Sequence, residues 1–66
     1  MEIVLNGSAF EVETGSSVRG LLESLGFGGK PVVVELDEQA IFPRDYANTP
    51  LREGARVEIV TLAAGG

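Results

Sequence analysis

The sequence predicts an α+β fold in which a mixed sheet of four or five strands carries one main helix on one face. Two patterns lead to this prediction. Short runs near both ends of the chain alternate apolar with polar residues, which is typical of strands that bury one face. Between them, apolar residues recur at the spacing i, i+3, i+4, i+7 of one helical face. With 66 residues, the chain has room for one domain.

A hairpin is expected at the start of the chain. Residues 1–6 and 9–14 both alternate apolar with polar side chains. The Asn6-Gly7 pair that separates them favours a two-residue turn, because asparagine and glycine tolerate the positive φ values that such a turn requires. We therefore expect two antiparallel strands over these ranges.

The main helix is expected to follow Gly15. Ser16 or Ser17 can cap it by accepting a hydrogen bond from a free backbone N–H group. Gly26 follows the last apolar position, where a left-handed residue commonly ends a helix. The apolar face consists of Val18, Leu21, Leu22 and Leu25.

The rest of the chain predicts further strands and turns. Residues 32–36 form an apolar, β-branched run, and we expect a strand that is covered on much of both faces. After it we expect, in order, a turn at Asp37-Glu38, a short strand over 39–42, a turn or short helix over 43–46, a turn at Glu53-Gly54 and a strand over 57–62. This order matches the β-grasp, or ubiquitin-like, architecture, in which the first and last strands lie side by side. We assign residues 1–62 to this domain and residues 63–66 to a flexible tail.

Composition excludes several classes of function. The chain has 10 acidic and 5 basic residues, a net charge of −5, which argues against a nucleic-acid partner. It has no cysteine and no histidine, so we expect no metal site and no cysteine or histidine chemistry. No segment approaches the ~20 apolar residues of a membrane span, and no signal-peptide pattern opens the chain. A cytoplasmic location follows as the default expectation.

The Gly65-Gly66 pair is the sharpest functional signal. A C-terminal carboxylate reacts as an electrophile only after activation, usually adenylation, and it must enter a narrow enzyme channel as an extended segment. Glycine suits both needs, because it has no Cβ to clash with the channel or crowd the carbonyl. We expect Gly66 to be the activated residue and Gly65, Ala64 and Ala63 to give channel access. A frayed end or a leftover expression scar is the alternative.

A docking surface is expected on the sheet. The helix should cover the face that carries Ile3, Leu5, Val57 and Ile59. Alternation then places Val4, Val60 and Leu62 on the opposite face. An exposed apolar patch near the tail indicates a surface that docks a partner. The alternative is that loop residues such as Phe42 and Tyr46 fold over the patch, and the sequence favours neither.

Several segments together resemble the ThiS family of thiamine-biosynthesis sulfur carriers. The most telling combination is Pro43-Arg44-x-Tyr46-Ala47 with Gly65-Gly66, and the resemblance covers the whole chain. It also includes Ile3 to Gly7, Ser17-Val18, Leu21-Leu22, Val32 to Leu36, Leu51, Gly54 and Val57 to Val60. The chain departs from the family pattern at Asp37-Glu38, where members often carry Asn-Gly, and at Ala55, where members often carry an acidic residue.

The resemblance implies a reaction cycle at Gly66. An E1-like adenylating enzyme of the ThiF type would use ATP and magnesium to convert the carboxylate into an acyl-adenylate. A sulfur donor, ultimately cysteine through a cysteine desulfurase, would leave a thiocarboxylate, and a thiazole synthase of the ThiG type would take the sulfur. The chain would then be a co-substrate rather than an enzyme and would bind no cofactor of its own.

Three alternatives stay open. A molybdopterin-pathway sulfur carrier shares the fold and chemistry, although such chains tend to have prolines where this one has Ala63-Ala64. A ubiquitin-like modifier would form an isopeptide bond through Gly66. A plain β-grasp interaction module would not need its tail.

Overall fold

The computed structural model describes residues 1–62, and the predicted tail, residues 63–66, lies outside the described residues. The elements are β1 (Glu2–Leu5), β2 (Ser8–Glu11), α1 (Val18–Ser24), β3 (Val32–Leu36), β4 (Gln39–Ile41), the 3₁₀ helix η1 (Pro43–Asn48) and β5 (Arg56–Thr61). The strands form one sheet in the order β2-β1-β5-β3-β4. Only the central pair β1–β5 is parallel among these ladders. The predicted α+β class and the neighbouring first and last strands are confirmed.

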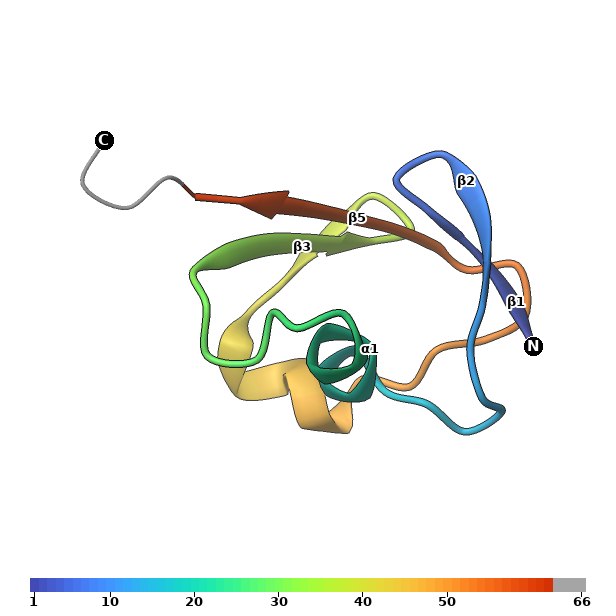
Figure 1. Cartoon of the computed structure of the whole chain (residues 1–66), viewed down its shortest axis with the longest axis horizontal. Helices are drawn as coiled ribbons and strands as arrows, with labels where there is room; N and C mark the ends of the chain where they lie inside the picture. Colours follow the sequence, from blue (N-terminus) through green and yellow to red (C-terminus); the bar gives the residue numbers. More distant parts are fainter. Residues whose placement is uncertain (63–66) are drawn as a thin grey trace.

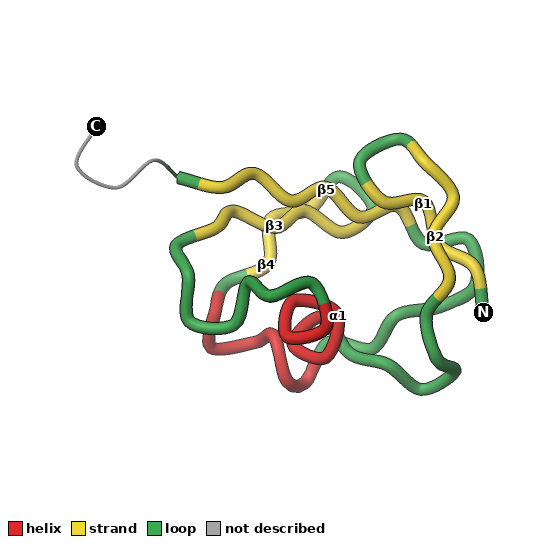
Figure 2. Tube along the Cα trace, in the orientation of Figure 1, coloured by secondary structure: helices red, strands yellow, loops and turns green. Residues whose placement is uncertain are grey.

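Two layers make up the molecule. The sheet forms one layer, and α1 and η1 lie together on one side of it (Figure 1). Figure 2 shows the same division, with the helical segments below the strands. The end of β5 lies at the opposite end of the long axis from Met1 (Figure 1).

Both predicted hairpin turns are confirmed, and both use the left-handed region of φ. Asn6 has φ 48° and Gly7 has φ 85° between β1 and β2, and Asp37 and Glu38 have φ 50° and 69° between β3 and β4. Two positive φ values in succession are typical of the turn whose twist matches that of paired strands. The second turn is also tied to β5, because the Arg56 N–H donates to Asp37 Oδ1 at 3.0 Å.

The helix α1 begins and ends as its sequence predicts. Ser17 is the N-cap, and its Oγ accepts a hydrogen bond from the Gly20 N–H at 3.1 Å. Gly26, with φ 82°, follows the C-cap residue Leu25. A helix of seven residues is marginal alone, so its stability depends on packing against the sheet.

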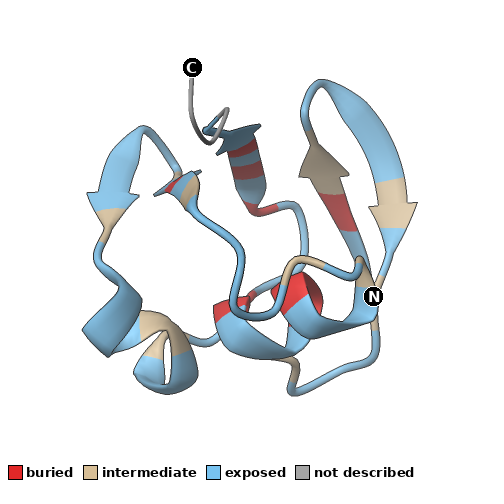
Figure 3. Cartoon of the chain, turned by 60° about the vertical axis from the view of Figure 1, so that its left-hand side comes forward, coloured by how far each residue is buried: buried red, intermediate tan, exposed pale blue. Residues whose placement is uncertain are grey.

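One core fills the space between the two layers. The buried side chains are Ile3, Val18, Leu21, Leu22, Val34, Leu51, Ala55, Val57 and Ile59. Figure 3 shows that buried positions alternate with exposed ones along β5 and gather on one side of α1. The prediction that β3 is covered on both faces is wrong: Val34 is fully buried, whereas Val33 is 43% exposed. The helices cover only one face of the sheet, so only every second residue of β3 reaches the core.

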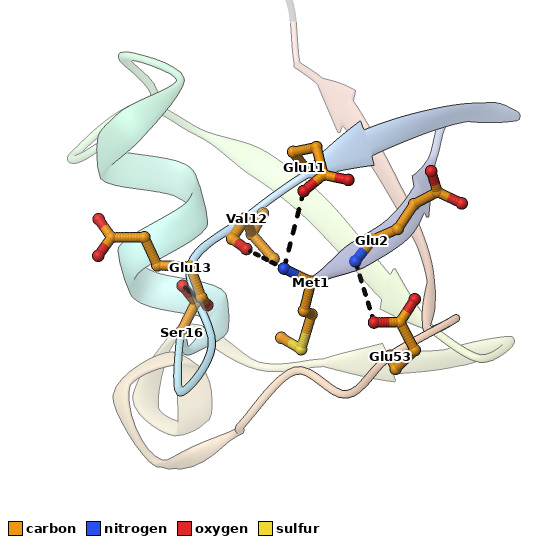
Figure 4. Close-up of polar contacts among 7 residues, drawn as sticks. All are labelled: Met1, Glu2, Glu11, Val12, Glu13, Ser16 and Glu53. Atoms are coloured by element: carbon orange, nitrogen blue, oxygen red, sulfur yellow. Dashed lines mark hydrogen bonds and ion pairs between the residues drawn. The ribbon is translucent and has the colours of Figure 1, made fainter.

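Polar contacts join the N-terminal strand to distant segments (Figure 4). The ammonium group of Met1 donates to the Val12 carbonyl at 2.8 Å and lies 3.8 Å from Glu11 Oε2. The Glu2 N–H donates to Glu53 Oε1 at 3.2 Å. These contacts hold β2 and the loop that precedes β5 on either side of β1.

Candidate functional site: the outer face of the sheet

Four large apolar side chains are exposed on the sheet face that the helices leave uncovered. The exposed fractions are 59% for Val60, 56% for Phe42, 51% for Leu62 and 43% for Val33. We call these four residues the outer apolar patch. Scattered exposed apolar residues are ordinary on a protein surface, whereas a contiguous group is typical of an interaction site.

Strand register brings the patch together. Val33 lies directly opposite Val60 in the β3–β5 ladder. Val34 pairs with Ile41, so Phe42, the next residue and also extended, comes opposite Val33 on the other side. Leu62 follows Val60 by two residues and therefore shares its face, and its N–H donates to the Pro31 carbonyl at 3.0 Å. The patch thus crosses β4, β3 and β5 where β5 approaches its end.

The predicted docking residues fall into two places. Val60 and Leu62 belong to the outer apolar patch. Val4 is half-buried and pairs with Arg56, four residues before Val60 on β5. At the rise of an extended strand this is a separation of roughly 13 Å. Val4 therefore lies on the same face but apart from the patch.

Loop residues do not cover the patch. Tyr46, in η1, packs against the core on the helical side of the sheet. Phe42 is itself one of the exposed residues. The alternative in which both fold over the outer face is wrong, because η1 runs beneath the sheet beside α1 (Figure 1).

Sequence reasoning missed Val33 and Phe42. The run Val32-Val33-Val34 is apolar throughout, so it carries no alternation that would assign a face. Glu35 held the usable signal: a charged residue there points to solvent, and Val33, two residues earlier, must share its side.

Negative charge borders the patch. Glu35 and Glu58 lie directly opposite each other on β3 and β5. Each lies two residues from Val33 or Val60 on its strand, so all four share one face. Glu38 and Arg56 line the same shallow depression. Like charges placed directly across two strands are unfavourable, so a basic side chain from a partner would relieve them.

A basic residue lies at the other border. The guanidinium carbon of Arg44 lies 5.1 Å from the centroid of the Phe42 ring, within the range of a cation–π interaction. The contact places a positive charge beside the Phe42 ring at the edge of the patch.

The remaining predicted site residues, Ala63, Ala64, Gly65 and Gly66, lie outside the described residues. They follow directly in sequence from β5 and Leu62. Within residues 1–62, no group of three or more carboxylates is placed to hold a metal ion. No helix in this part of the chain is long and apolar enough to cross a membrane.

Comparison with known proteins indicates the family of the chain. Residues 2–66 match the model of the ThiS family. The chain is 39% identical over 62 residues to the sulfur carrier protein ThiS of Thermus thermophilus, a match that covers 94% of this chain and 95% of that protein. The crystal structure of the thiamine biosynthesis protein ThiS from Geobacter metallireducens superposes with a TM-score of 0.85 at 26% identity, with both chains fully covered.

Larger proteins contain a similar segment. The chain is 35% identical over all of its 66 residues to a thiazole synthase of Magnetococcus marinus. It spans only 20% of the length of that protein. Three findings agree on the same family: the family model that matches nearly the whole chain, the relative of similar length, and the structure with the same fold. The chain therefore belongs to the ThiS family.

Proposed function

We propose that this chain is a sulfur carrier of thiamine biosynthesis, which works through the carboxylate of Gly66. The observation that carries the proposal is the end-to-end similarity to the sulfur carrier of T. thermophilus, over 94% of one chain and 95% of the other. The two final glycines support it, because a residue without a Cβ leaves the terminal carbonyl open to attack.

The proposed chemistry takes place in two steps. A carboxylate oxygen of Gly66 attacks the α-phosphorus of ATP on an adenylating enzyme of the ThiF type, and pyrophosphate leaves with magnesium as counter-ion. Hydrosulfide, which a thiol reductant releases from the persulfide formed by a cysteine desulfurase, then attacks the activated carbonyl carbon, displaces AMP and loses its proton. The product is a thiocarboxylate, and a thiazole synthase takes its sulfur into the thiazole ring. The chain is a co-substrate that each enzyme releases again.

The outer apolar patch is the surface we propose for docking these enzymes. Exposed apolar groups supply binding energy, and the neighbouring Glu35–Glu58 pair favours a partner with a basic side chain beside its own apolar surface. Val4 lies on the same face and belongs to the proposed contact area as a peripheral residue. Because the patch lies where β5 ends, an enzyme docked on it would be close to the residues that follow β5 in the sequence.

Thiazole synthase is supported as a partner by gene fusion. In the thiazole synthases of M. marinus and Paramagnetospirillum magneticum, a segment similar to this entire chain belongs to the same polypeptide. Proteins that act on each other's products are often joined in this way. The ThiF-type enzyme and the desulfurase are proposed from the family resemblance and from the need to activate the Gly66 carboxylate and supply its sulfur.

Intact-mass spectrometry tests the proposal. The chain is incubated with a ThiF-type enzyme, magnesium-ATP and sulfide, and the expected product is heavier by the difference between one sulfur and one oxygen atom. The matched control lacks Gly66. Conversion that occurs equally without Gly66, or no conversion at all, contradicts the proposal. A ladder of heavier conjugates in cell extract would instead identify a ubiquitin-like modifier, and sulfur transfer to molybdopterin synthase rather than thiazole synthase would identify the molybdopterin pathway.

A further inference from the structure

A second surface lies on the helical side of the molecule, where the connection from α1 to β3 runs beside η1 (Figure 1). There the two segments enclose an open groove of about 970 Å³. Its lining mixes apolar residues, among them Phe27, Pro31 and Tyr46, with the basic side chains of Arg19, Lys30 and Arg44. We call this surface the basic groove. It adjoins the outer apolar patch, because Arg44 contacts the Phe42 ring and the Pro31 carbonyl accepts the Leu62 N–H.

Charge is distributed unevenly between the groove and the rest of the chain. Three of the five basic residues line the groove together with one acidic residue, Glu23, which gives a local charge of +2. Because the whole chain carries −5, the remaining surface carries −7. Basic side chains outnumber acidic ones in this groove, whereas acidic side chains outnumber basic ones in the depression beside Glu11 and Glu13 and in the one beside Glu35 and Glu58.

Neighbouring carboxylates do not neutralise the groove. Arg19 Nε lies 3.3 Å from Glu23 Oε2 in an exposed pair, and Arg44 Nε lies 3.9 Å from Asp45 Oδ2. Exposed pairs of this kind contribute little and exchange readily for another carboxylate. Lys30 forms no ion pair with any described residue.

The shape and charge of the groove select its ligand. Sites for small molecules usually enclose most of the ligand surface, whereas this groove is partly open to solvent. An extended peptide segment suits such a groove, because it can place apolar side chains on the walls and leave its other side in water. A nucleic acid or a second copy of this chain would extend beyond the groove and bring many negative charges against the remaining surface of net charge −7, which a short segment confined to the groove avoids.

We propose that the basic groove binds a short acidic peptide segment of a partner protein, with glutamate or aspartate against Arg19, Lys30 and Arg44 and an apolar side chain between Phe27 and Tyr46. Occupation of the groove leaves the outer apolar patch uncovered. A short segment held there can retain the chain while enzymes bind the neighbouring outer apolar patch. The inference goes beyond the proposed function and does not depend on sulfur loading at Gly66.

Nuclear magnetic resonance tests the proposal with the full chain. The ¹⁵N-labelled protein is titrated with a blocked peptide of alternating glutamate and leucine that contains one tyrosine, and with the same peptide carrying glutamine for glutamate. We expect saturable shifts of the amides of Gly28, Gly29 and Ala47 with the acidic peptide only. The shifts should weaken as salt rises, because added ions screen exposed charges.

Charge reversal supplies the matched comparison. Lys30→Glu removes an attraction and adds a repulsion, so the affinity should fall about tenfold, whereas Arg52→Glu makes the same change in net charge away from the groove and should have little effect. Arg19→Glu is the second groove variant should Lys30→Glu fail to fold, because Arg19 lies in α1, on the helical side of the sheet. Four outcomes would overturn the proposal. They are the absence of a saturable shift, an equal loss of affinity in Arg52→Glu, shifts centred on the outer apolar patch, and self-association without peptide. Sulfur loading of the Lys30→Glu chain should be unchanged, which separates this result from a failure of the proposed function.

Discussion

The side-chain amide of Asn6 forms hydrogen bonds with both backbone groups of Ile59, which lies 53 residues later in the chain. Asn6 Oδ1 accepts from the Ile59 N–H at 2.8 Å, and Nδ2 donates to the Ile59 carbonyl at 3.3 Å. The parallel β1–β5 ladder pairs only Val4 with Arg56 and Leu5 with Val57. The asparagine side chain thus extends this short ladder after the backbone has turned away towards β2.

Replacement of Asn6 should separate its side-chain role from its backbone role. Asn6→Gly keeps the positive φ and removes both bonds to Ile59, so we expect unfolding to require about 1–3 kcal/mol less. Asn6→Ala should lower the free energy of unfolding by about 1 kcal/mol more than Asn6→Gly does, because alanine is strained at φ 48°. Urea denaturation followed by circular dichroism measures both. A glycine variant as stable as the parent would show that the bonds to Ile59 add nothing.

Gly20 and Gly26 should respond in opposite directions to alanine. Gly20 lies within α1, and an added Cβ would meet only Ser17 Oγ at 3.6 Å, an ordinary contact. Gly20→Ala should therefore stabilise the chain by about 1 kcal/mol and raise the Tm by roughly 4–8 °C. Gly26→Ala, with open space but φ 82°, should lower the Tm. Scanning calorimetry of the two variants compares them, and a lower Tm for Gly20→Ala would refute the assignment.

The outer apolar patch should matter for docking and little for stability. In the double variant Val33→Thr with Val60→Thr, each side chain keeps its β-branched shape and loses an exposed apolar group. The KM of the adenylating enzyme for this variant should rise about tenfold, at nearly unchanged unfolding free energy. Steady-state kinetics of pyrophosphate release provide the measurement.

Two controls accompany that experiment. Thr14→Ser changes an exposed residue beside α1, on the helical side of the sheet, and should leave KM unchanged. Val34→Thr places a hydroxyl group in the core beside the patch and should instead destabilise the fold by about 1–3 kcal/mol. An unaltered KM in the double variant would exclude the patch as the docking surface.

Gly65→Val should block sulfur loading and spare the fold. Among the described residues the buried core runs from Ile3 to Ile59. We expect a change at residue 65 to leave this core intact and to shift the Tm by less than about 2 °C. A side chain next to the terminal carbonyl should obstruct the channel and reduce loading to the background of the chain without Gly66. Intact-mass spectrometry and thermal melting are run on the same sample. A marked fall in the Tm would mean that the tail packs on the domain.

Local patterns in the sequence predicted most of the fold. The Asn6-Gly7 and Asp37-Glu38 turns, the Ser17 cap and the helix end at Gly26 all depend on residues close together in the chain. Asn6, Gly7 and Gly26 tolerate positive φ and Ser17 favours the N-cap, whereas Glu38, at φ 69°, has no such preference. The order of such elements was then sufficient to predict a central β1–β5 pair, which the sheet confirms.

Features that depend on distant partners were not predictable. No local pattern shows that Asn6 bonds Ile59, because the two meet only in the folded sheet. The exposure of Val33 depends on which face of β3 the helices cover; the run Val32-Val33-Val34 by itself assigns no face, and only Glu35 indicates it. The basic groove was missed for the same reason: Arg19, Lys30 and Arg44 come from three segments that only η1 and α1 bring together.

The parallel pairing of β1 with β5 has a consequence for biosynthesis. The strand made first needs the strand made last as its neighbour, so the sheet cannot close until the ribosome has released residues 56–61. Contacts of such long sequence separation also form late and slowly, because loop closure must precede them. A polypeptide that stops before Arg56 should therefore stay unfolded and be degraded by proteases. Only chains that have been synthesised through β5, the strand that precedes the proposed reactive residues, can therefore reach the native fold.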